Sequence, residues 1–339
     1  MNQKAAIIGF GGMGQRHYAA YKKINVDVCA ICDIYKNKIC EVIPDFPEEH
    51  TYNDINEMIK NEEIDILSVV TNGPTHALNS ITASKSGILN ILCEKPIATN
   101  LRDAQKVIDV CSKNGTRLAV NHIRRWSHDY INLKKMIKNG VIGDLRHIYF
   151  SCGSTGLGNF VGHFFDTMRY LTDSEPDWTI GFIDKTGTIN PRGSQFKDPG
   201  GYGMIYMKNG TRCFIDSSED TGVQYSFQLV GTYGRIIIDE LNNSWQIMAR
   251  NQENRQSPLT RYGLQMESIP FESQVFDIVD LTGKAIAELL SGDDVSCSGD
   301  DGKKSLEMVL SFHISDYARN RKIYFPLKGR ALKLDIPIG

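Results

Sequence analysis

Short apolar runs alternate with segments of helix-compatible sequence along the first third of the chain. The apolar runs predict buried strands in the style of a parallel sheet, at residues 5–8, 26–32, 64–70, 89–93 and 117–121. The segments between them predict helices, at residues 15–23, 36–42, 55–60, 75–85 and 101–113. The expected N-caps of the last three helices are Asp54, Thr75 and Asn100. This alternation predicts a doubly wound parallel sheet over residues 1–121.

The pattern changes in the remainder of the chain, where strand-like runs follow one another with few helices between them. These runs predict strands at residues 146–152, 178–184, 203–207, 212–217, 226–230, 235–239 and 245–249. Helices are predicted at residues 126–138, 158–171, 275–290 and 303–320. The polar segment 252–261 is predicted to be a loop. We therefore expect a second domain over residues 122–339, of class α+β with a mostly antiparallel sheet.

A glycine pattern of the form G-x-G-x-x-G lies between the first strand and the first helix. It reads Gly9-Phe10-Gly11-Gly12-Met13-Gly14. Gly9 permits a tight turn, Gly11 lets the backbone approach a pyrophosphate, and Gly14 lets the helix pack close to the strand. Free N–H groups and the helix dipole then face the phosphates. The pattern predicts a dinucleotide site, and the alternative is an α/β turn that binds no phosphate.

Asp33 ends the second strand, 19 positions after Gly14. A carboxylate at this place accepts hydrogen bonds from an adenosine ribose and repels a 2′-phosphate, which favours NAD over NADP. Lys36 is close enough in sequence to attract a 2′-phosphate, so use of both cofactors stays open. If the glycine turn binds no phosphate, Asp33 is instead expected to cap a helix.

Composition narrows the class of protein. The chain has 339 residues, 41% of them hydrophobic, and a formal net charge of −2. This balance gives no basic field for nucleic acid, and no apolar run is long enough for a membrane span. The N-terminus shows no signal-peptide pattern, so we expect a cytoplasmic protein. The eight cysteines are expected to be reduced and structural, with no metal site.

Polar residues follow the predicted strands of the first domain, where ligands of open parallel sheets bind. They are Asp33, residues 71–76, Glu94-Lys95-Pro96 and residues 121–125. Lys95 can donate to a substrate oxygen or, if desolvated, titrate near neutral pH. A surface lysine paired with Glu94 is an equally weighted alternative.

The predicted helix 158–171 carries the second candidate for chemistry. Its spacing places Asn159, His163 and Asp166 on one face. An imidazole presented there can accept or return a proton near neutral pH. A histidine that only packs in the core or caps a helix is the commoner case, and periodicity does not separate the two.

Taken together, these motifs resemble the Gfo/Idh/MocA family of NAD(P)-dependent oxidoreductases. The likeness rests on the glycine run, Asp33, Thr71-Asn72-Gly73-Pro74-Thr75-His76, Cys93-Glu94-Lys95-Pro96 and His163-Phe164-Phe165-Asp166. It covers the first 171 residues by motif and the rest by architecture. The resemblance implies an N-terminal Rossmann domain and a C-terminal domain whose open sheet often joins subunits. A homodimer or homotetramer is therefore expected.

The resemblance also implies a chemistry. Hydride would move between nicotinamide C4 and a secondary hydroxyl or keto carbon of a sugar, cyclitol or nucleotide-sugar. Lys95 would hydrogen-bond the reacting oxygen and His163 would accept the proton. Further cofactor contacts are expected from Thr71, Asn72, His76 and Glu94, and substrate contacts from Arg124, Arg125, Trp126 and Asn159.

One position departs from the family pattern. Many relatives have an aspartate four residues before the histidine, where this chain has Asn159. An amide cannot take a proton, so Asn159 could only orient substrate. Arg124 and Arg125 would suit a carboxylate or phosphate, although one of the two could be structural.

Two other functions compete with a dehydrogenase or reductase. A glycosidase or epimerase could oxidise the sugar transiently and regenerate its cofactor. A sensor could bind the dinucleotide without turnover, but such a protein would need neither Lys95 nor His163.

Overall fold

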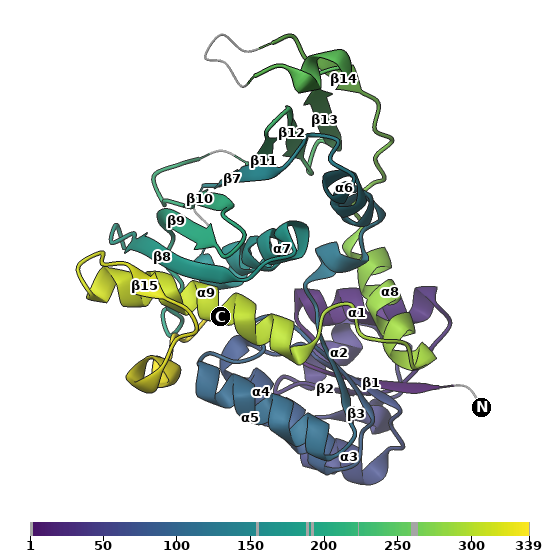
Figure 1. Cartoon of the computed structure of the whole chain (residues 1–339). Coiled ribbons are helices and arrows are strands. Elements are labelled where there is room, and N and C mark those ends of the chain that lie inside the picture. The colour runs from purple at the N-terminus through teal and green to yellow at the C-terminus, as the bar shows by residue number, and fades with distance from the viewer. Residues whose placement is uncertain are drawn as a thin grey trace.

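The computed structural model describes residues 3–153, 156–187, 190, 193–222, 224–258 and 264–338. These residues form two sheets, each with its own helices, and the long helix α9 (Gly299–Tyr317) runs between them (Figure 1). Among them, no helix is both long enough and apolar enough to cross a membrane.

The N-terminal sheet is parallel throughout the described strands. In spatial order the strands are β3 (Thr51–Tyr52), β2 (Asp27–Cys32), β1 (Lys4–Ile8), β4 (Ile66–Val69), β5 (Asn90–Cys93) and β6 (Arg117–Val120). The helices that follow the strands are α1 (Gly12–Lys23), α2 (Asn37–Val42), α3 (Ile55–Asn61), α4 (Gly73–Lys85) and α5 (Leu101–Lys113). The strand order reverses between β1 and β4, which is the doubly wound arrangement of a Rossmann fold. The predicted parallel sheet is confirmed.

The helix caps show where local sequence decides the structure. Asp54 accepts hydrogen bonds from Asn56 N and Glu57 N, and Asn100 accepts one from Asp103 N, as predicted. The prediction of Thr75 as an N-cap is wrong. Helix α4 begins at Gly73, with Asn72 at its N-cap. Pro74 fits in the first turn, because proline lacks an N–H group and the first N–H groups of a helix have no partner within the helix.

The C-terminal sheet is mixed and mostly antiparallel, as predicted; only β7 and β10 pair in parallel among the described strands. Its spatial order is β14 (Glu267–Ile269), β13 (Ser244–Ala249), β12 (Gly234–Asp239), β11 (Ser226–Gly231), β7 (Leu145–Ser151), β10 (Arg212–Asp216), β9 (Gly201–Met207), β8 (Pro176–Ile183) and β15 (Ile323–Tyr324). The edge strands β14 and β15 were not predicted, because they are too short to show a period of two. Residues 253–256 of the predicted loop form a 3-10 turn, and 259–261 lie outside the described residues.

The helices of the second domain begin differently from the predictions. Residues 123–126 form a 3-10 turn before α6 (His128–Lys138). Residues 157–161 form a π-helical turn before α7 (Gly162–Thr172). Helix α9 begins at Gly299, four residues before the predicted start, because Ser298 and Asp301 form a capping box.

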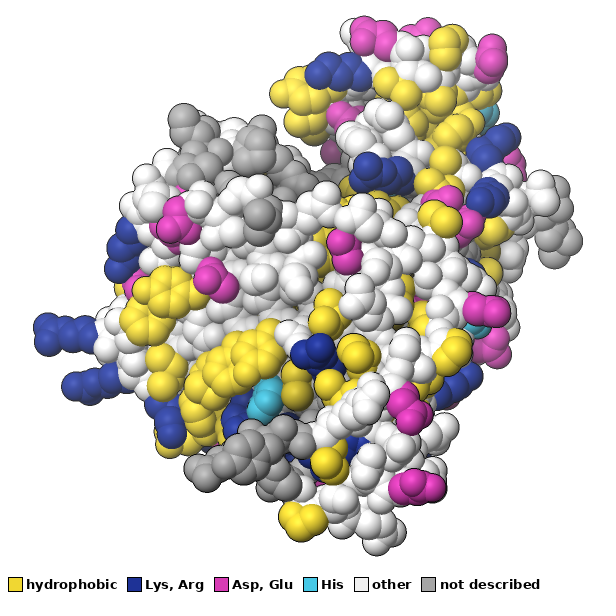
Figure 2. Space-filling model, turned by 90° about the horizontal axis from the view of Figure 1, so that it is seen from above, with side chains coloured by type: hydrophobic (Ala, Val, Ile, Leu, Met, Phe, Trp, Pro, Cys, Tyr) yellow, Lys and Arg dark blue, Asp and Glu magenta, His cyan; other side chains and the backbone are white. Residues whose placement is uncertain are grey.

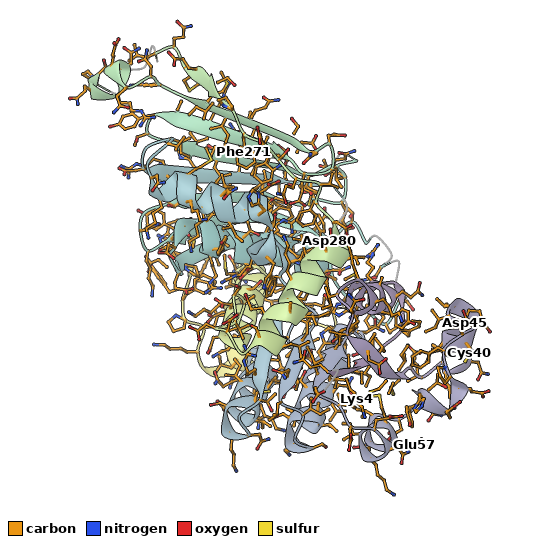
Figure 3. All side chains as sticks on the ribbon, turned by 90° about the vertical axis from the view of Figure 1, so that its right-hand side faces the viewer. Lys4, Cys40, Asp45, Glu57, Phe271 and Asp280 are labelled. Atoms are coloured by element: carbon orange, nitrogen blue, oxygen red, sulfur yellow. The ribbon has the colours of Figure 1, made fainter. Side chains whose placement is uncertain are left out.

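Two helices of the C-terminal segment fasten the domains together. Helix α8 (Ile278–Ser291) packs on α1, and Asp280 lies near its start (Figure 3). Asp280 pairs with Lys23 at the end of α1. Helix α9 contacts α5 and β6 in one domain and α7 and β8 in the other. This packing holds the carboxyl ends of the parallel strands against the second sheet.

The two faces of the C-terminal sheet differ. One is covered by α7 and α9 and carries buried residues such as Phe150, Ile205 and Phe227. The opposite face carries stacked aromatic pairs, Tyr149 with Phe214, Trp178 with Tyr206 and Phe182 with Tyr202. Tyr149 and Tyr202 are 42% and 45% exposed. Figure 2 shows hydrophobic side chains gathered in a row on the molecule seen from above.

Candidate active site

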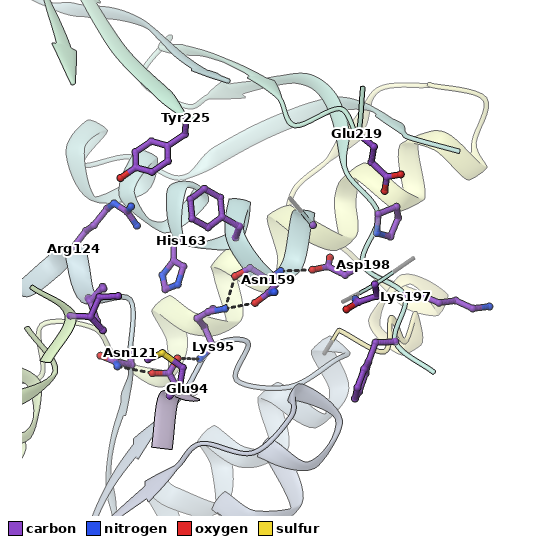
Figure 4. A pocket seen from close by; sticks show the side chains of 18 of the residues that line it. Glu94, Lys95, Asn121, Arg124, Asn159, His163, Lys197, Asp198, Glu219 and Tyr225 are labelled. Carbon is purple, nitrogen blue, oxygen red and sulfur yellow. Dashed lines mark hydrogen bonds between the residues drawn. The ribbon is translucent and has the colours of Figure 1, made fainter. Parts of the chain in front are cut away.

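A cavity of about 810 Å³ lies between the two domains. The N-terminal domain contributes Met13, Glu94, Lys95 and Asn121 to its lining, and the C-terminal domain contributes residues such as Asn159, His163, Asp198, Tyr225 and Glu240. Strand ends of the parallel sheet therefore face side chains of the second domain, which is where ligands of such sheets bind (Figure 4).

The glycine run contains two kinds of glycine: some have no room for a side chain, and others border open space. A Cβ on Gly9 would lie 2.6 Å from the Val70 backbone, and one on Gly14 would lie 2.1 Å from Gly9 O. A Cβ on Gly11 or Gly12 would have no protein atom within 4 Å. Helix α1 begins there with its first N–H groups unpaired within the helix, so the open space fits the pyrophosphate of a dinucleotide.

Asp33 lies beside this turn. Its Oδ2 accepts a hydrogen bond of 2.6 Å from Phe10 N, and its Oδ1 accepts one of 2.8 Å from Tyr35 N. Asp33 is not the cap of α2, because Lys36 occupies that position. The carboxylate is held at the edge of the glycine run with lone pairs left to accept from ribose hydroxyl groups.

Residues 71–76 form the start of α4. The ring nitrogens of His76 lie 2.7 Å from the carbonyl oxygens of Pro96 and Thr71, and burial lowers the pKa of His76. His76 thus ties this segment to the Lys95-Pro96 loop. Thr71, Asn72 and His76 lie outside the cavity lining, as do Asp33 and most of the glycine run.

Glu94 belongs to a buried polar network. Its Oε1 lies 3.0 Å from His17 Nε2 and accepts a hydrogen bond of 2.7 Å from Asn121 Nδ2. His17 Nδ1 continues the network to Ser68 Oγ at 3.0 Å. Burial alone would raise the pKa of Glu94, but the hydrogen bond and charge of His17, together with Lys95 and Asn121, lower it to about 2. An ionised Glu94 therefore links α1 to the strand end that carries Lys95.

Lys95 reaches across the cavity to the second domain. Its Nζ donates to the backbone oxygen of Asn159 and, at 2.9 Å, to Asn159 Oδ1 (Figure 4). Asn159 N in turn donates to Asp198 Oδ2 at 2.7 Å, and Gly158 N donates to Asp198 Oδ1 at the same distance. The lysine is thus a half-buried residue held by Asn159, and the alternative of a surface lysine is wrong.

His163 faces the same cavity from α7. Its ring meets that of His122 edge to face, with centroids 5.4 Å apart. Burial, Lys95, His122 and Arg124 lower the pKa of His163 well below its ordinary value. A neutral imidazole in this position is able to take up a proton.

Asp166 lies three residues after His163 in α7 but does not line the cavity. Asp166 is fully buried and accepts two hydrogen bonds from Arg125, of 2.8 and 2.7 Å. The π-helical turn ends at Val161 and separates Asn159 from His163, so the regular i, i+4 spacing expected between those two residues does not apply.

The adjacent arginines have different positions. Arg124 lines the cavity and pairs with Glu240. Arg125 pairs with Asp166 and Asp301 outside the lining, and Trp126 is buried outside it as well. Both guanidinium groups therefore already hold carboxylates of this chain.

Sequence reasoning missed much of the lining contributed by the second domain. Asp198, Tyr225 and Glu240 come from separate loops and strand ends of the second domain. No motif or spacing marks them, because their proximity to Lys95 and His163 arises only from the tertiary fold. Among the described residues, no group of three or more His, Cys, Asp or Glu residues could hold a metal ion.

Comparison with known proteins agrees with this architecture. Residues 3–122 match the model of an oxidoreductase family with an NAD-binding Rossmann fold, GFO_IDH_MocA. The chain therefore carries the NAD-binding domain of the Gfo/Idh/MocA family. It is an NAD(P)-dependent oxidoreductase, which confirms the resemblance and the NAD cofactor predicted from the glycine run.

Two relatives that match nearly the whole chain share less than 30% identity with it, and a third matches less than half of it. The chain is 24% identical to a myo-inositol 2-dehydrogenase of Thermotoga maritima, over 99% of this chain and 100% of the relative. It is 28% identical to a D-apiose dehydrogenase of Paraburkholderia graminis, over 92% and 87%. An inositol 2-dehydrogenase of Salmonella typhimurium is 31% identical, over 42% of this chain and 44% of the relative.

Solved structures share the whole fold. An aldose-aldose oxidoreductase from Caulobacter crescentus, complexed with glycerol, has a TM-score of 0.79 at 19% identity, over 96% of this chain and 100% of that chain. An oxidoreductase from Agrobacterium radiobacter, in complex with NAD+, L-tartaric acid and magnesium, has a TM-score of 0.77 at 19% identity, over 96% and 98%.

Proposed function

We propose that this chain transfers a hydride between NAD and a secondary hydroxyl or keto carbon of an uncharged sugar or cyclitol. The observation that carries the proposal is the position of Lys95 and His163, which lie 68 positions apart in sequence yet face one cavity beside the parallel strand ends. Relatives along the full chain that act on myo-inositol and D-apiose support a polyhydroxylated substrate.

Each residue has a distinct part in the proposed reaction. When bound, NAD+ supplies the hydride acceptor. The glycine run holds its pyrophosphate, and Asp33 receives the ribose hydroxyl groups. Lys95 donates a hydrogen bond to the reacting oxygen and stabilises the negative charge that develops there. His163 takes the hydroxyl proton on oxidation and returns it on reduction.

The charge of the lining favours an uncharged substrate. Arg124 and Arg125 were expected to receive a carboxylate or phosphate, but each is paired with a carboxylate of the chain at 2.7 Å. Asp198 and Glu240 also line the cavity and can accept hydrogen bonds from substrate hydroxyl groups. Sugars and cyclitols provide such donors without a net charge.

A spectrophotometric screen tests the proposal. The purified protein is mixed with NAD+ or NADP+ and with sugars, inositols or sugar nucleotides, and reduced cofactor is followed by absorbance. Net NADH formation with a polyol supports a dehydrogenase. Consumption of substrate without net NADH indicates a glycosidase or epimerase, and cofactor binding without turnover of any substrate indicates a sensor.

We also propose that the aromatic face of the C-terminal sheet joins subunits. Three stacked aromatic pairs lie on this face, which α7 and α9 leave uncovered. Apolar patches of this kind mark association surfaces. Light scattering coupled to size-exclusion chromatography tests this, because Tyr149→Glu should lower the molecular mass of an oligomer and leave a monomer unchanged.

A further inference from the structure

An ion pair in the cavity wall joins Arg124, in the turn after β6, to Glu240, directly after β12. Arg124 Nε and Nη2 donate to the two carboxylate oxygens of Glu240, at 3.1 and 2.7 Å, and the Tyr225 hydroxyl donates to Glu240 Oε2. Arg124, Glu240 and Tyr225 are 5%, 7% and 8% exposed. The pair is therefore two-pronged, largely buried and held in place from a second side.

This pair leaves one donor available. Among the described residues, Arg124 Nη1 has no hydrogen-bond partner. The guanidinium carbon lies 4.0 Å from the centre of the Phe164 ring, which fixes the plane of the group. Arg124 can therefore give a hydrogen bond to a bound molecule while Glu240 balances its charge.

We propose that Glu240 sets the charge preference of the substrate site, so that Arg124 binds a hydroxyl group and not a carboxylate or phosphate. This inference rests on the proposed function. Without Glu240, the two-pronged edge of Arg124 would be open in a site of low dielectric, where an anion gains most from a guanidinium. With Glu240 present, that edge is filled and an incoming anion meets a carboxylate.

The other charges of the lining do not reverse this preference. Asp184, Asp198 and Glu219 add carboxylates. Of the cations, Lys185 pairs with Asp316 at 3.0 Å, Lys197 is next to Asp198 in sequence, and Arg16 lies on α1 beside the glycine run. Lys95 and Arg124 are close enough to His163 for their positive charges to lower its pKa, and Lys95 donates a hydrogen bond to Asn159.

Titration calorimetry on the NAD-saturated protein tests the inference with D-glucose and D-glucuronate, which differ by one carboxylate. The unmodified protein should bind D-glucose at least about tenfold more tightly than D-glucuronate. Glu240→Gln should raise the affinity for D-glucuronate by about tenfold or more, and added salt should reduce the gain. Unchanged affinity for D-glucuronate in a folded Glu240→Gln protein would overturn the proposal.

A matched control is the pair of Arg169 with Glu175, which has the same two-pronged geometry outside the cavity lining, at 2.8 and 2.9 Å. Glu175→Gln should leave the affinity for both sugars unchanged, and a gain for D-glucuronate there would contradict a local effect. The double variant Arg124→Gln/Glu240→Gln removes both charges and should not gain affinity for D-glucuronate; such a gain would overturn the proposal.

Two measurements keep the test decisive. If Glu240→Gln does not fold, because it leaves Arg124 buried without its partner, the unmodified protein still decides: equal or tighter binding of D-glucuronate than of D-glucose overturns the proposal. If the unmodified protein binds NAD but no sugar of either charge, the proposed function fails, and the inference fails with it. Sugar binding without the charge preference overturns the inference alone.

Discussion

The cofactor wall, by which we mean the glycine turn beside the cavity, and the substrate wall, which lines the cavity itself, are built on different principles. The cofactor wall consists of backbone: Gly9 and Gly14 pack where a Cβ would clash, and Gly11 and Gly12 face open space. The substrate wall consists of paired side chains, in which Arg124 is held by Glu240 and Lys95 by Asn159. The shape of the cofactor site therefore depends on where a Cβ can fit in the glycine turn. The substrate site depends on pairs of charged and polar side chains that the fold brings together from distant segments.

Removal of the two side chains proposed to act on the substrate should have the largest effect. It should lower turnover and leave cofactor binding unchanged, which distinguishes the substrate wall from the cofactor wall. Lys95→Ala and His163→Ala should each lower kcat by roughly 10²–10⁴-fold, because positioned proton transfer and charge stabilisation are lost. The affinity for NAD, measured by fluorescence titration, should stay nearly constant. Near-normal turnover in both variants would show that neither residue takes part in the chemistry.

Acid should lower the stability of the fold through His122, which is buried with its ring against that of His163. Burial lowers the pKa of His122 to about 4, whereas the unfolded chain ionises it near 6.5. The unfolded state therefore binds the extra proton first as pH falls, and stability present above pH 6.5 is lost towards pH 4. The shift corresponds to about 3 kcal/mol of unfolding free energy.

Urea unfolding across this pH range measures the loss. His122→Gln should make the dependence of the unfolding free energy on pH less steep. A dependence that is equally steep in the His122 variant would contradict this origin.

A side chain in the open part of the glycine turn should affect the cofactor wall alone. In Gly11→Val the added Cβ has no protein atom within 4 Å, so the fold should persist, but the side chain fills the space of the pyrophosphate. NAD should bind at least about tenfold more weakly. Unchanged NAD affinity would mean that the turn is only structural. Gly9→Val is the contrasting variant, because its Cβ meets the Val70 backbone and should destabilise the fold itself.

Asp33 should have the smallest effect, limited to the choice of cofactor. Asp33→Ala removes the carboxylate that opposes a 2′-phosphate and should narrow the preference for NAD over NADP by about tenfold. The ratio of the two dissociation constants measures this. Equal affinities for NAD and NADP in the unmodified protein would count against the role.

The same contrast explains what could be predicted from the sequence. The strands of the parallel sheet and the glycine run could be predicted, because each depends on the pattern of a single segment. Local pattern placed Asp33 and Lys95 at strand ends, but it did not decide between a functional and a surface lysine. Asp198 and Glu240 could not be found, because nothing near them in sequence relates them to His163. Arg125 was assigned to the substrate from its place after β6, but it forms an ion pair with Asp166, 41 positions away in sequence.

The central claim is that Lys95 and His163 act on one substrate oxygen, and a double-mutant cycle tests it most directly. We would measure kcat/KM for NAD-dependent oxidation of a polyol in the unmodified protein, Lys95→Ala, His163→Ala and the double variant. Residues that act as a unit are strongly non-additive, so the double variant should lose little more than the worse single variant. Losses that simply multiply in the double variant would contradict the account.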